Sequence, residues 1–218
     1  MLEKNIREQI IELIHQQVVP AVGCTEPMAV ALCTARATEL LGQKPEHISV
    51  LLSANILKNA MGVGIPGTGM IGLPIAIALG ALVGKSEYQL EVIKDLTPVT
   101  LEAGKTFISE NRIDVKLKDG ITEKLYIEIT CEAEGHRATA IIMGTHTNIV
   151  FEEKDGTVLL DKMQPSTAAV EKAPLCLNLN TVWEFATTTP VDEIEFILEA
   201  KRYNLRAASE ALKGNYGH

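Results

Sequence analysis

The stretch from Asn55 to Gly84 limits what this chain can fold into more than any other part of the sequence. No charged residue occurs between Lys58 and Lys85, and seven glycines lie between Gly62 and Gly84. Glycine tolerates a positive φ and lets another group approach the backbone closely. The pattern therefore predicts a glycine-rich loop that leads into an apolar helix.

Other interpretations of this stretch are weaker. Gly62, Gly64 and Gly67 match the GxGxxG spacing of dinucleotide-binding loops, but the residues before them predict a helix instead of the required strand. Lys85 and Ser86 follow Gly84, but the residue five positions before Gly84 is Leu79 instead of the glycine that the P-loop pattern requires, which excludes a P-loop. The apolar run from Met70 to Val83 is broken by Pro74 and is shorter than the roughly 20 residues of a membrane span. A buried core helix explains the run better.

The size and charge of the chain exclude several classes of protein. With 218 residues, of which 46% are hydrophobic, the chain is long enough to form a sizeable core. A net charge of −8 leaves no basic field for nucleic acid or for an anionic membrane surface. The amino terminus is charged and amphipathic, unlike a signal peptide. The four cysteines form no CxxC pair, so we expect a cytoplasmic protein with reduced thiols.

The order of the hydrophobic patterns predicts an α+β fold. Helical patterns at both ends of the chain enclose a middle part that is rich in alternating, β-type sequence. We expect a helical domain with the glycine-rich loop at residues 1–88, and its continuation at 164–218. Residues 89–163 are expected to form an inserted small α/β sandwich of mostly antiparallel strands.

Individual elements follow from local signals. Thr25 is the expected N-cap of the second helix, which Gly42 ends, and Thr97 is the expected N-cap of a helix from Pro98 to Glu110. A long final helix is expected from Pro190 to Gly214. The expected strands are Ile48 to Leu52, Glu91 to Lys94, Asp114 to Lys118, Lys124 to Cys131, His136 to Gly144, Thr147 to Glu152 and Val158 to Asp161.

Cys24 is the cysteine best placed for chemistry. It immediately precedes the expected start of a helix, where the dipole and free N–H groups stabilise the thiolate that binds metals or attacks electrophiles. The alternative is a buried structural thiol, and this is the preferred interpretation of Cys33, Cys131 and Cys176. Glu26 is interpreted as a simple first-turn helix carboxylate.

The glycine-rich loop has the features of a small anion site. Thr68 lies between Gly67 and Gly69, so its hydroxyl and the neighbouring N–H groups can converge on a substrate carboxylate. Lys58 and Asn59 lead directly into this loop. Lys58 is either a solvated helix charge or a partner for the carboxylate of a substrate.

His146 is a second candidate for chemistry. It lies in the sequence GTHTNIV, where Thr147 and Asn148 supply hydrogen-bonding groups beside an imidazole that can titrate near neutrality. His146 would act either as a base or as a substrate anchor. A surface histidine at the start of a strand is the alternative.

Three of these sequences resemble the signatures of a known family. VGCTEPMAVAL, NILKNAMGVGIPGTGMIGLPIA and IIMGTHTNIV are similar to motifs of the L-cysteine desulfidases, which are related to the iron–sulfur L-serine dehydratases through their alpha chain. The resemblance extends over essentially the whole chain with the order preserved. It implies a lyase that uses a [4Fe-4S] cluster, and no pyridoxal phosphate, to convert L-cysteine to pyruvate, ammonia and sulfide.

The resemblance also implies roles for the candidate residues. Loss of a β-substituent needs a Lewis acid at the leaving group and a base for the Cα proton. Cys24 is then an expected cluster ligand, and His146 and Lys58 are the expected catalytic residues. The expected substrate-binding residues are Asn59, Gly67, Thr68, Gly69, Thr147 and Asn148.

The chain departs from that family in length. Members of the family are about twice as long, and a cluster with one open iron needs about three cysteinates, so the other ligands are expected in a carboxy-terminal half that this chain lacks. Alone, the chain is expected to fold but to hold no cluster and to be inactive. Its expected partners are a small amino acid, the missing half and further copies in a homo-oligomer, with no nucleic acid and no membrane.

Three alternatives stay open. In the first, the substrate is L-serine instead of L-cysteine, since the sequence does not distinguish the two substrates. In the second, the chain is a regulatory module in which the glycine-rich loop binds an amino acid without chemistry. In the third, Cys24 is the nucleophile of a cluster-free hydrolase, which requires a histidine at hydrogen-bond distance.

Overall fold

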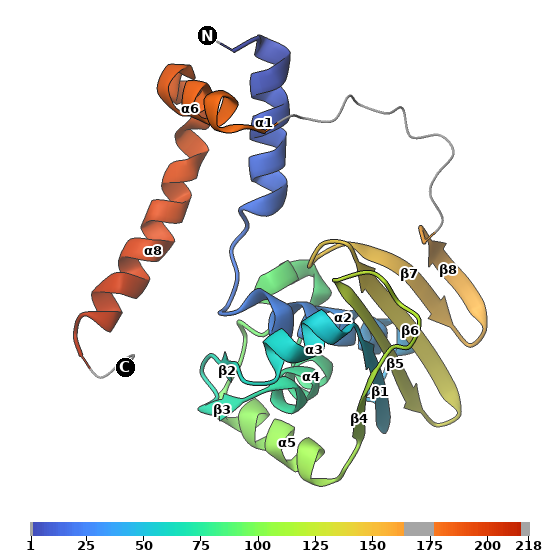
Figure 1. The fold of residues 1–218 in the computed structure, drawn as a ribbon. Coiled ribbons are helices and arrows are strands. Elements are labelled where there is room, and N and C mark those ends of the chain that lie inside the picture. Colours follow the sequence, from blue (N-terminus) through green and yellow to red (C-terminus); the bar gives the residue numbers. More distant parts are fainter. Residues whose placement is uncertain (1, 164–176, 215–218) are drawn as a thin grey trace. The chain divides into compact units, whose positions relative to one another are not determined.

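The computed structural model describes residues 2–163 and 177–214 (Figure 1). These ranges form two compact units, residues 21–163 and residues 2–20 together with 177–214. Helices and a mixed, mostly antiparallel sheet make the fold α+β, which confirms the predicted class. In the described ranges, no helix is both long enough and apolar enough to cross a membrane.

A six-stranded sheet forms one side of the larger unit, in the order β4-β1-β5-β6-β7-β8. The first strand, β1, pairs in parallel with β4, and every other pairing is antiparallel. Six of the seven strands expected from the alternating patterns are strands of this sheet. The strands are β1 (His47–Leu52), β4 (Ile113–Leu117), β5 (Tyr126–Ala133), β6 (His136–Met143), β7 (Ile149–Lys154) and β8 (Thr157–Asp161).

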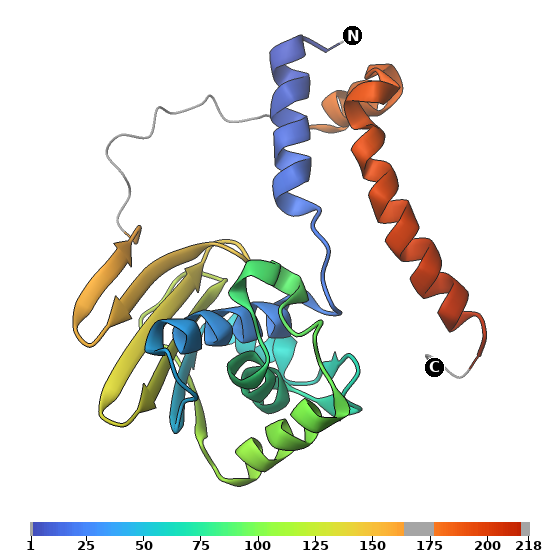
Figure 2. The same ribbon diagram turned by 180° about the vertical axis from the view of Figure 1, so that it is seen from behind.

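One face of the sheet is covered by α2 (Thr25–Leu41), which lies in front of the strands in Figure 2. Eleven of its residues are buried, because it packs on β5 and β6 on one side and on α4 (Leu73–Leu82) on the other. The apolar helix α4 also packs against α5 (Pro98–Ser109). This burial on several sides explains why the run from Met70 to Val83 lacks charges.

Small residues allow α2 and α4 to approach closely. A Cβ added at Gly80 would lie 2.5 Å from the Ala31 backbone oxygen. Just past the end of α4, a Cβ added at Gly84 would lie 2.9 Å from the Ala35 Cβ. These two glycines of the charge-free stretch therefore serve helix packing and do not belong to the loop.

The structure divides the chain differently from the expected segments. Strand β1, from the segment expected to be helical, lies between β4 and β5, and α2 and α4 of that segment cover the sheet. Because a sheet must bury its apolar face against another layer, residues 89–163 cannot be separated from the helices before them. The expected boundary between residues 88 and 89 falls inside one compact unit.

Two local predictions were wrong. The expected strand from Glu91 to Lys94 is instead the end of the 3-10 helix η1 (Ser86–Glu91) and a following turn, with local hydrogen bonds such as Lys94 N–H to Glu91 O. Its apolar residues are buried because the segment packs on α2. The expected single final helix is broken into α7 (Val191–Ile194), η2 (Glu195–Ile197) and α8 (Leu198–Ala211), and α6 (Leu179–Thr188) precedes them.

The smaller unit consists of α1 (Lys4–Gln17) with α6, α7, η2 and α8. Arg7 on α1 forms a bidentate pair with Glu193, with N–O distances of 3.0 and 2.9 Å. The rings of His15 and Phe196 stack at 4.0 Å between centroids. These contacts join the first helix of the chain to its last helices.

The close packing of α2 on α4 predicts the effect of a Gly80→Ala substitution. We expect it to lower the free energy of unfolding by about 1–3 kcal/mol, because the new Cβ forces two backbones apart. Gly104→Ala in α5 is the matched control, because its Cβ would meet only the side-chain tips of Leu79 and Ile75, at 3.2 and 3.3 Å. Urea unfolding measures both, and equal losses would contradict the role of Gly80.

Candidate functional site

The sequence VGCTEP forms the approach to α2 and its first turn. Cys24 occupies the N-cap position, and Thr25, the expected cap, is the first residue of the helix. The expected position was wrong by one residue because the Thr25 hydroxyl does not cap the backbone. It donates instead to the Glu26 carboxylate at 3.2 Å.

The Glu26 carboxylate links this turn to the glycine-rich segment. It accepts hydrogen bonds from the Cys24 thiol at 3.1 Å, from the Thr25 hydroxyl and from the Asn59 side-chain amide at 3.2 Å. Asn59 lies on α3 (Ala54–Ala60), the helix that leads into the glycines. The hydrogen bonds, with that from Cys24 first, lower the pKa of Glu26. Glu26 is therefore the centre of a polar cluster that the sequence did not indicate.

Cys24 has a raised pKa, which contradicts the expected stabilised thiolate. Burial raises the pKa of the thiol most, and its hydrogen bond to the Glu26 carboxylate raises it further. Backbone N–H groups at the start of the helix lower it, but by less. Burial and the hydrogen bond to Glu26 therefore outweigh the backbone N–H groups of the helix start, and the thiol keeps its proton at neutral pH.

The glycine-rich segment forms a tight hairpin of β2 (Gly64–Ile65) and β3 (Met70–Ile71). Gly67 and Gly69 have positive φ angles of 76° and 64°, as the sequence predicts. Thr68 between them is buried, and its hydroxyl donates to Ile65 O at 2.6 Å and accepts from Met70 N–H at 2.9 Å. The Thr68 hydroxyl thus braces the hairpin and does not point to an external anion.

The hairpin also touches the approach to α2 directly. Gly23 has a φ of 82°, and a Cβ placed there would lie 2.6 Å from Pro66 Cγ. The two longest motifs of the sequence resemblance therefore meet at two points, the Gly23–Pro66 contact and the Glu26–Asn59 hydrogen bond.

An open, mainly apolar cavity of about 440 Å³ adjoins this contact. Of the predicted site residues, Gly67 lines it, whereas Cys24 and Asn59 do not. The polar cluster and the cavity are therefore neighbours and not one pocket. The lining residues are Val22, Pro66, Gly67, Ile93, Lys94, Leu96, Thr97, Pro98 and Leu101.

His146 lies with Thr147 in the turn between β6 and β7, and both side chains are half-buried. Asn148 closes this turn, because its side-chain amide donates to Met143 O at 2.9 Å. In the ranges that the structure describes, His146 makes no hydrogen bond or ion pair with the Cys24 cluster. Lys58 is exposed and likewise has no ion-pair partner among the described residues.

The turn with His146 nevertheless lies at the same end of the sheet as the start of α2. Along α2, the Cys33 thiol faces Ile127 O near the start of β5, and Thr38 faces Cys131 further along that strand. The helix therefore runs parallel to β5 and begins beyond its first residue, Tyr126. Tyr126 pairs with Met143, the last residue of β6 and the residue from which the turn departs.

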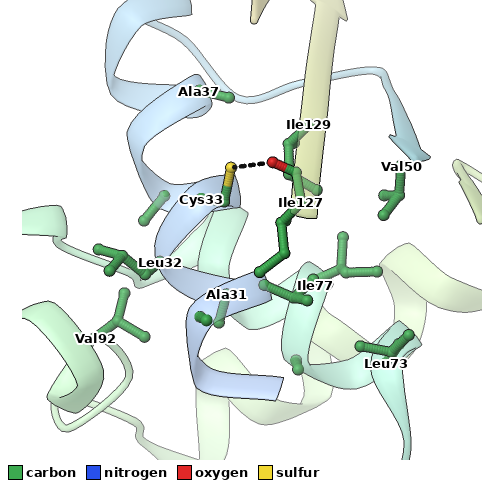
Figure 3. Packing of buried hydrophobic residues seen from close by; sticks show 14 of the residues in the cluster. Ala31, Leu32, Cys33, Ala37, Val50, Leu73, Ile77, Val92, Ile127 and Ile129 are labelled. Atoms are coloured by element: carbon green, nitrogen blue, oxygen red, sulfur yellow. Dashed lines mark hydrogen bonds between the residues drawn. The ribbon is translucent and has the colours of Figure 1, made fainter. Parts of the chain in front are cut away.

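Cys33 and Cys131 are structural thiols, as expected. Both are fully buried, and Figure 3 shows the Cys33 sulfur within the apolar core, where it donates to Ala140 O at 3.3 Å and Ile127 O at 3.8 Å. Burial raises the pKa of both thiols, that of Cys131 to about 12. The fourth cysteine, Cys176, lies outside the described residues.

The described residues do not fit a [4Fe-4S] cluster by themselves. Such a cluster needs about three cysteinates in one place, and Cys24 is the one thiol of the described ranges that is not buried. No three His, Cys, Asp or Glu side chains in these ranges are grouped so that they could hold a metal ion. Cys24 can therefore supply at most one ligand of a larger set.

Similar proteins include several that are named UPF0597 proteins. The chain is 63% identical over 217 residues to one from Bacteroides fragilis, 54% over 220 residues to one from Parabacteroides distasonis and 48% over 223 residues to one from Porphyromonas gingivalis. The chain is thus similar to UPF0597 proteins. Each match covers the whole chain but 51% or 52% of the relative, so the chain spans about half the length of these relatives. No family model and no solved structure matches it.

The hydrogen bond between Cys24 and Glu26 predicts the effect of a Glu26→Gln substitution. Glutamine keeps the shape of the side chain but lacks the charge that retains the thiol proton, so the pKa of Cys24 should fall toward its ordinary value. Alkylation of Cys24 by iodoacetamide at neutral pH, followed by mass spectrometry of its peptide, should then become severalfold faster. Glu39→Gln, on the same helix but far from Cys24, is the control, and an unchanged rate in Glu26→Gln would refute the assignment.

Proposed function

We propose that this chain is one half of a lyase that removes the β-substituent of a small L-amino acid. The substrate that the sequence resemblance favours is L-cysteine, with pyruvate, ammonia and sulfide as products. One observation carries the proposal. The motifs VGCTEP and NILKNAMGVGIPGTG, which are separate in the sequence, are joined by the hydrogen bond between Glu26 and Asn59, which spans 33 positions. Two motifs of the same family resemblance that contact each other in the structure support a common functional site.

Within this site, Cys24 is proposed as the ligand that the chain contributes to an iron–sulfur cluster. Only a thiolate binds a metal, so cluster binding would release the Cys24 proton, which in the free chain is hydrogen-bonded to the Glu26 carboxylate 3.1 Å from the sulfur. The remaining ligands would come from outside the described residues. Glu26 also holds Asn59, so one carboxylate orients both the thiol and a candidate substrate-binding amide.

The other predicted residues take roles in this proposal that match their positions. His146 and Lys58 are the candidates for the base that removes the Cα proton, because both carry a titratable nitrogen without a partner among the described residues. Asn59, Gly67, Gly69, Thr147 and Asn148 are the candidates for holding the substrate. Thr68 contributes by bracing the hairpin from within.

Cysteine substitutions in a protein extended to the full length of the relatives test the proposal. After anaerobic reconstitution with iron and sulfide, it should release pyruvate from L-cysteine or L-serine, and Cys24→Ala should lose both iron and turnover. Cys33→Ala is the matched control. The Cys33 thiol lies in the core, so this variant should keep both its iron and its turnover. The 218-residue chain alone should show neither bound iron nor turnover.

Retention of iron and turnover in Cys24→Ala would show that Cys24 is not a ligand of the cluster. Binding of L-cysteine without turnover in a protein that holds iron would favour the regulatory module instead. Turnover without iron would favour the hydrolytic alternative, in which Cys24 is the nucleophile.

The kinetics of a His146→Ala variant distinguish the two roles proposed for that residue. Loss of the base lowers kcat by several orders of magnitude with little effect on KM, whereas loss of a substrate anchor mainly raises KM. Steady-state kinetics of pyruvate release measure both constants. His136→Ala, at the other end of β6, is the control, and two unchanged constants in His146→Ala would show a surface histidine.

A further inference from the structure

The smaller unit buries few side chains for its length. Among the described residues of the smaller unit, the buried side chains are those of Ile10, Phe185 and Thr189. Helices in proteins are stabilised mainly by packing an apolar face against other structure. The helices of this unit therefore have apolar faces that the unit itself leaves open.

The apolar face of α8 is a stripe of three leucines. Leu198, Leu205 and Leu212 recur every seven residues, which places them on one side of the helix. Their exposed fractions are 56%, 55% and 87%. This leucine stripe is longer than one turn, whereas isolated exposed leucines are common on monomers.

Helix α6 has a second open face. Leu179, Val182 and Trp183 follow each other at the three- and four-residue spacing of one helix side. Their exposed fractions are 83%, 50% and 70%, while Phe185 on the other side is buried. Exposed apolar residues grouped in this way mark a surface that contacts other protein.

The lengths of the relatives indicate what covers these faces. In each of the three relatives the match covers 51% or 52% of the protein, so nearly as many residues again lie outside it. A second copy of α8 is less suitable, because Lys201 lies beside the leucine stripe and would bring a second unpaired positive charge to it, whereas Arg202 pairs with Glu199 at 3.1 Å. Lys201 has no ion-pair partner within the described ranges.

We propose that the leucine stripe of α8 and the open face of α6 form a docking surface. Its occupant is the part of the longer protein that the relatives possess outside the matched region. The chemistry of the surface requires an amphipathic helix with aliphatic residues toward the leucines and a carboxylate near Lys201. This assignment does not depend on lyase chemistry, because it rests on exposed residues of the smaller unit.

Cysteine accessibility tests this surface without any activity assay. Leu205→Cys is placed on the stripe, and Glu210→Cys, on the opposite side of α8, is the matched control. Each variant is prepared in the 218-residue chain and in a fusion that carries the remaining half of the Bacteroides fragilis relative, in the order found in that relative. Each variant is labelled with iodoacetamide, and mass spectrometry of the labelled peptides distinguishes the introduced cysteine from the native cysteines.

We expect labelling of Leu205→Cys to be at least tenfold slower in the fusion, with Glu210→Cys equally fast in both proteins. Equal rates for Leu205→Cys would overturn the proposal. Protection that grows with the concentration of the 218-residue chain alone would also overturn it, because a second copy would then be the occupant.

Leu205→Asp provides a measurement that does not rely on labelling. In the 218-residue chain it should leave the urea midpoint unchanged, because the side chain is exposed. In the fusion it should lower the midpoint, because the charge would be buried at the interface. An unchanged urea midpoint in a fusion that unfolds cooperatively would contradict the docking surface. A second fusion, which carries the remaining half of the Parabacteroides distasonis relative, repeats the test.

Discussion

The packing of α2 against the sheet and against α4 is the interaction on which the larger unit depends. Its alanines meet Gly80 and Gly84 on one side, and its Cys33 thiol reaches carbonyl oxygens of β5 and β6 on the other. At the edge of this contact, Arg36 forms a bidentate pair with Glu152 on β7, with N–O distances of 2.7 and 2.9 Å. A helix held on two sides and along its length has one possible axis.

The candidate site takes its geometry from this fixed axis. The first turn of α2 extends past the end of the sheet, so Cys24 and Glu26 project from a rigid support. Helix α3 is held separately, because the Ser53 hydroxyl accepts from Ile56 N–H and donates to Lys124 O at 2.7 Å. Asn59 on α3 therefore reaches Glu26 from a second rigid element, and the polar cluster connects two parts of the core rather than two loops.

The fold could be predicted from sequence where the signal was local. The six strands follow their alternating patterns, and Thr97 is the N-cap of α5, as expected. The prediction of a strand from Glu91 to Lys94 was wrong because an alternating pattern does not show whether a segment is buried by a sheet or by a helix. Helix α6 has no charge periodicity, and its threonines and Trp183 favour strands, so it was missed. The place of β1 between β4 and β5 joins distant segments, which no local pattern encodes.

The candidate site could likewise be predicted only where its residues have a local sequence signal. Cys24 could be found because a cysteine before a helix has a local meaning, whereas the role of Glu26 depends on Asn59, 33 positions away. That role also decides the chemistry of the thiol. Burial and the hydrogen bond to Glu26 raise the pKa of Cys24, and ionisation would also place two negative charges about 3.1 Å apart, which repel each other. A cation that contacts both groups removes this repulsion and favours the thiolate. The same carboxylate thus helps to keep the free thiol protonated, and under the proposed function Cys24 would become a ligand only when positive charge arrives.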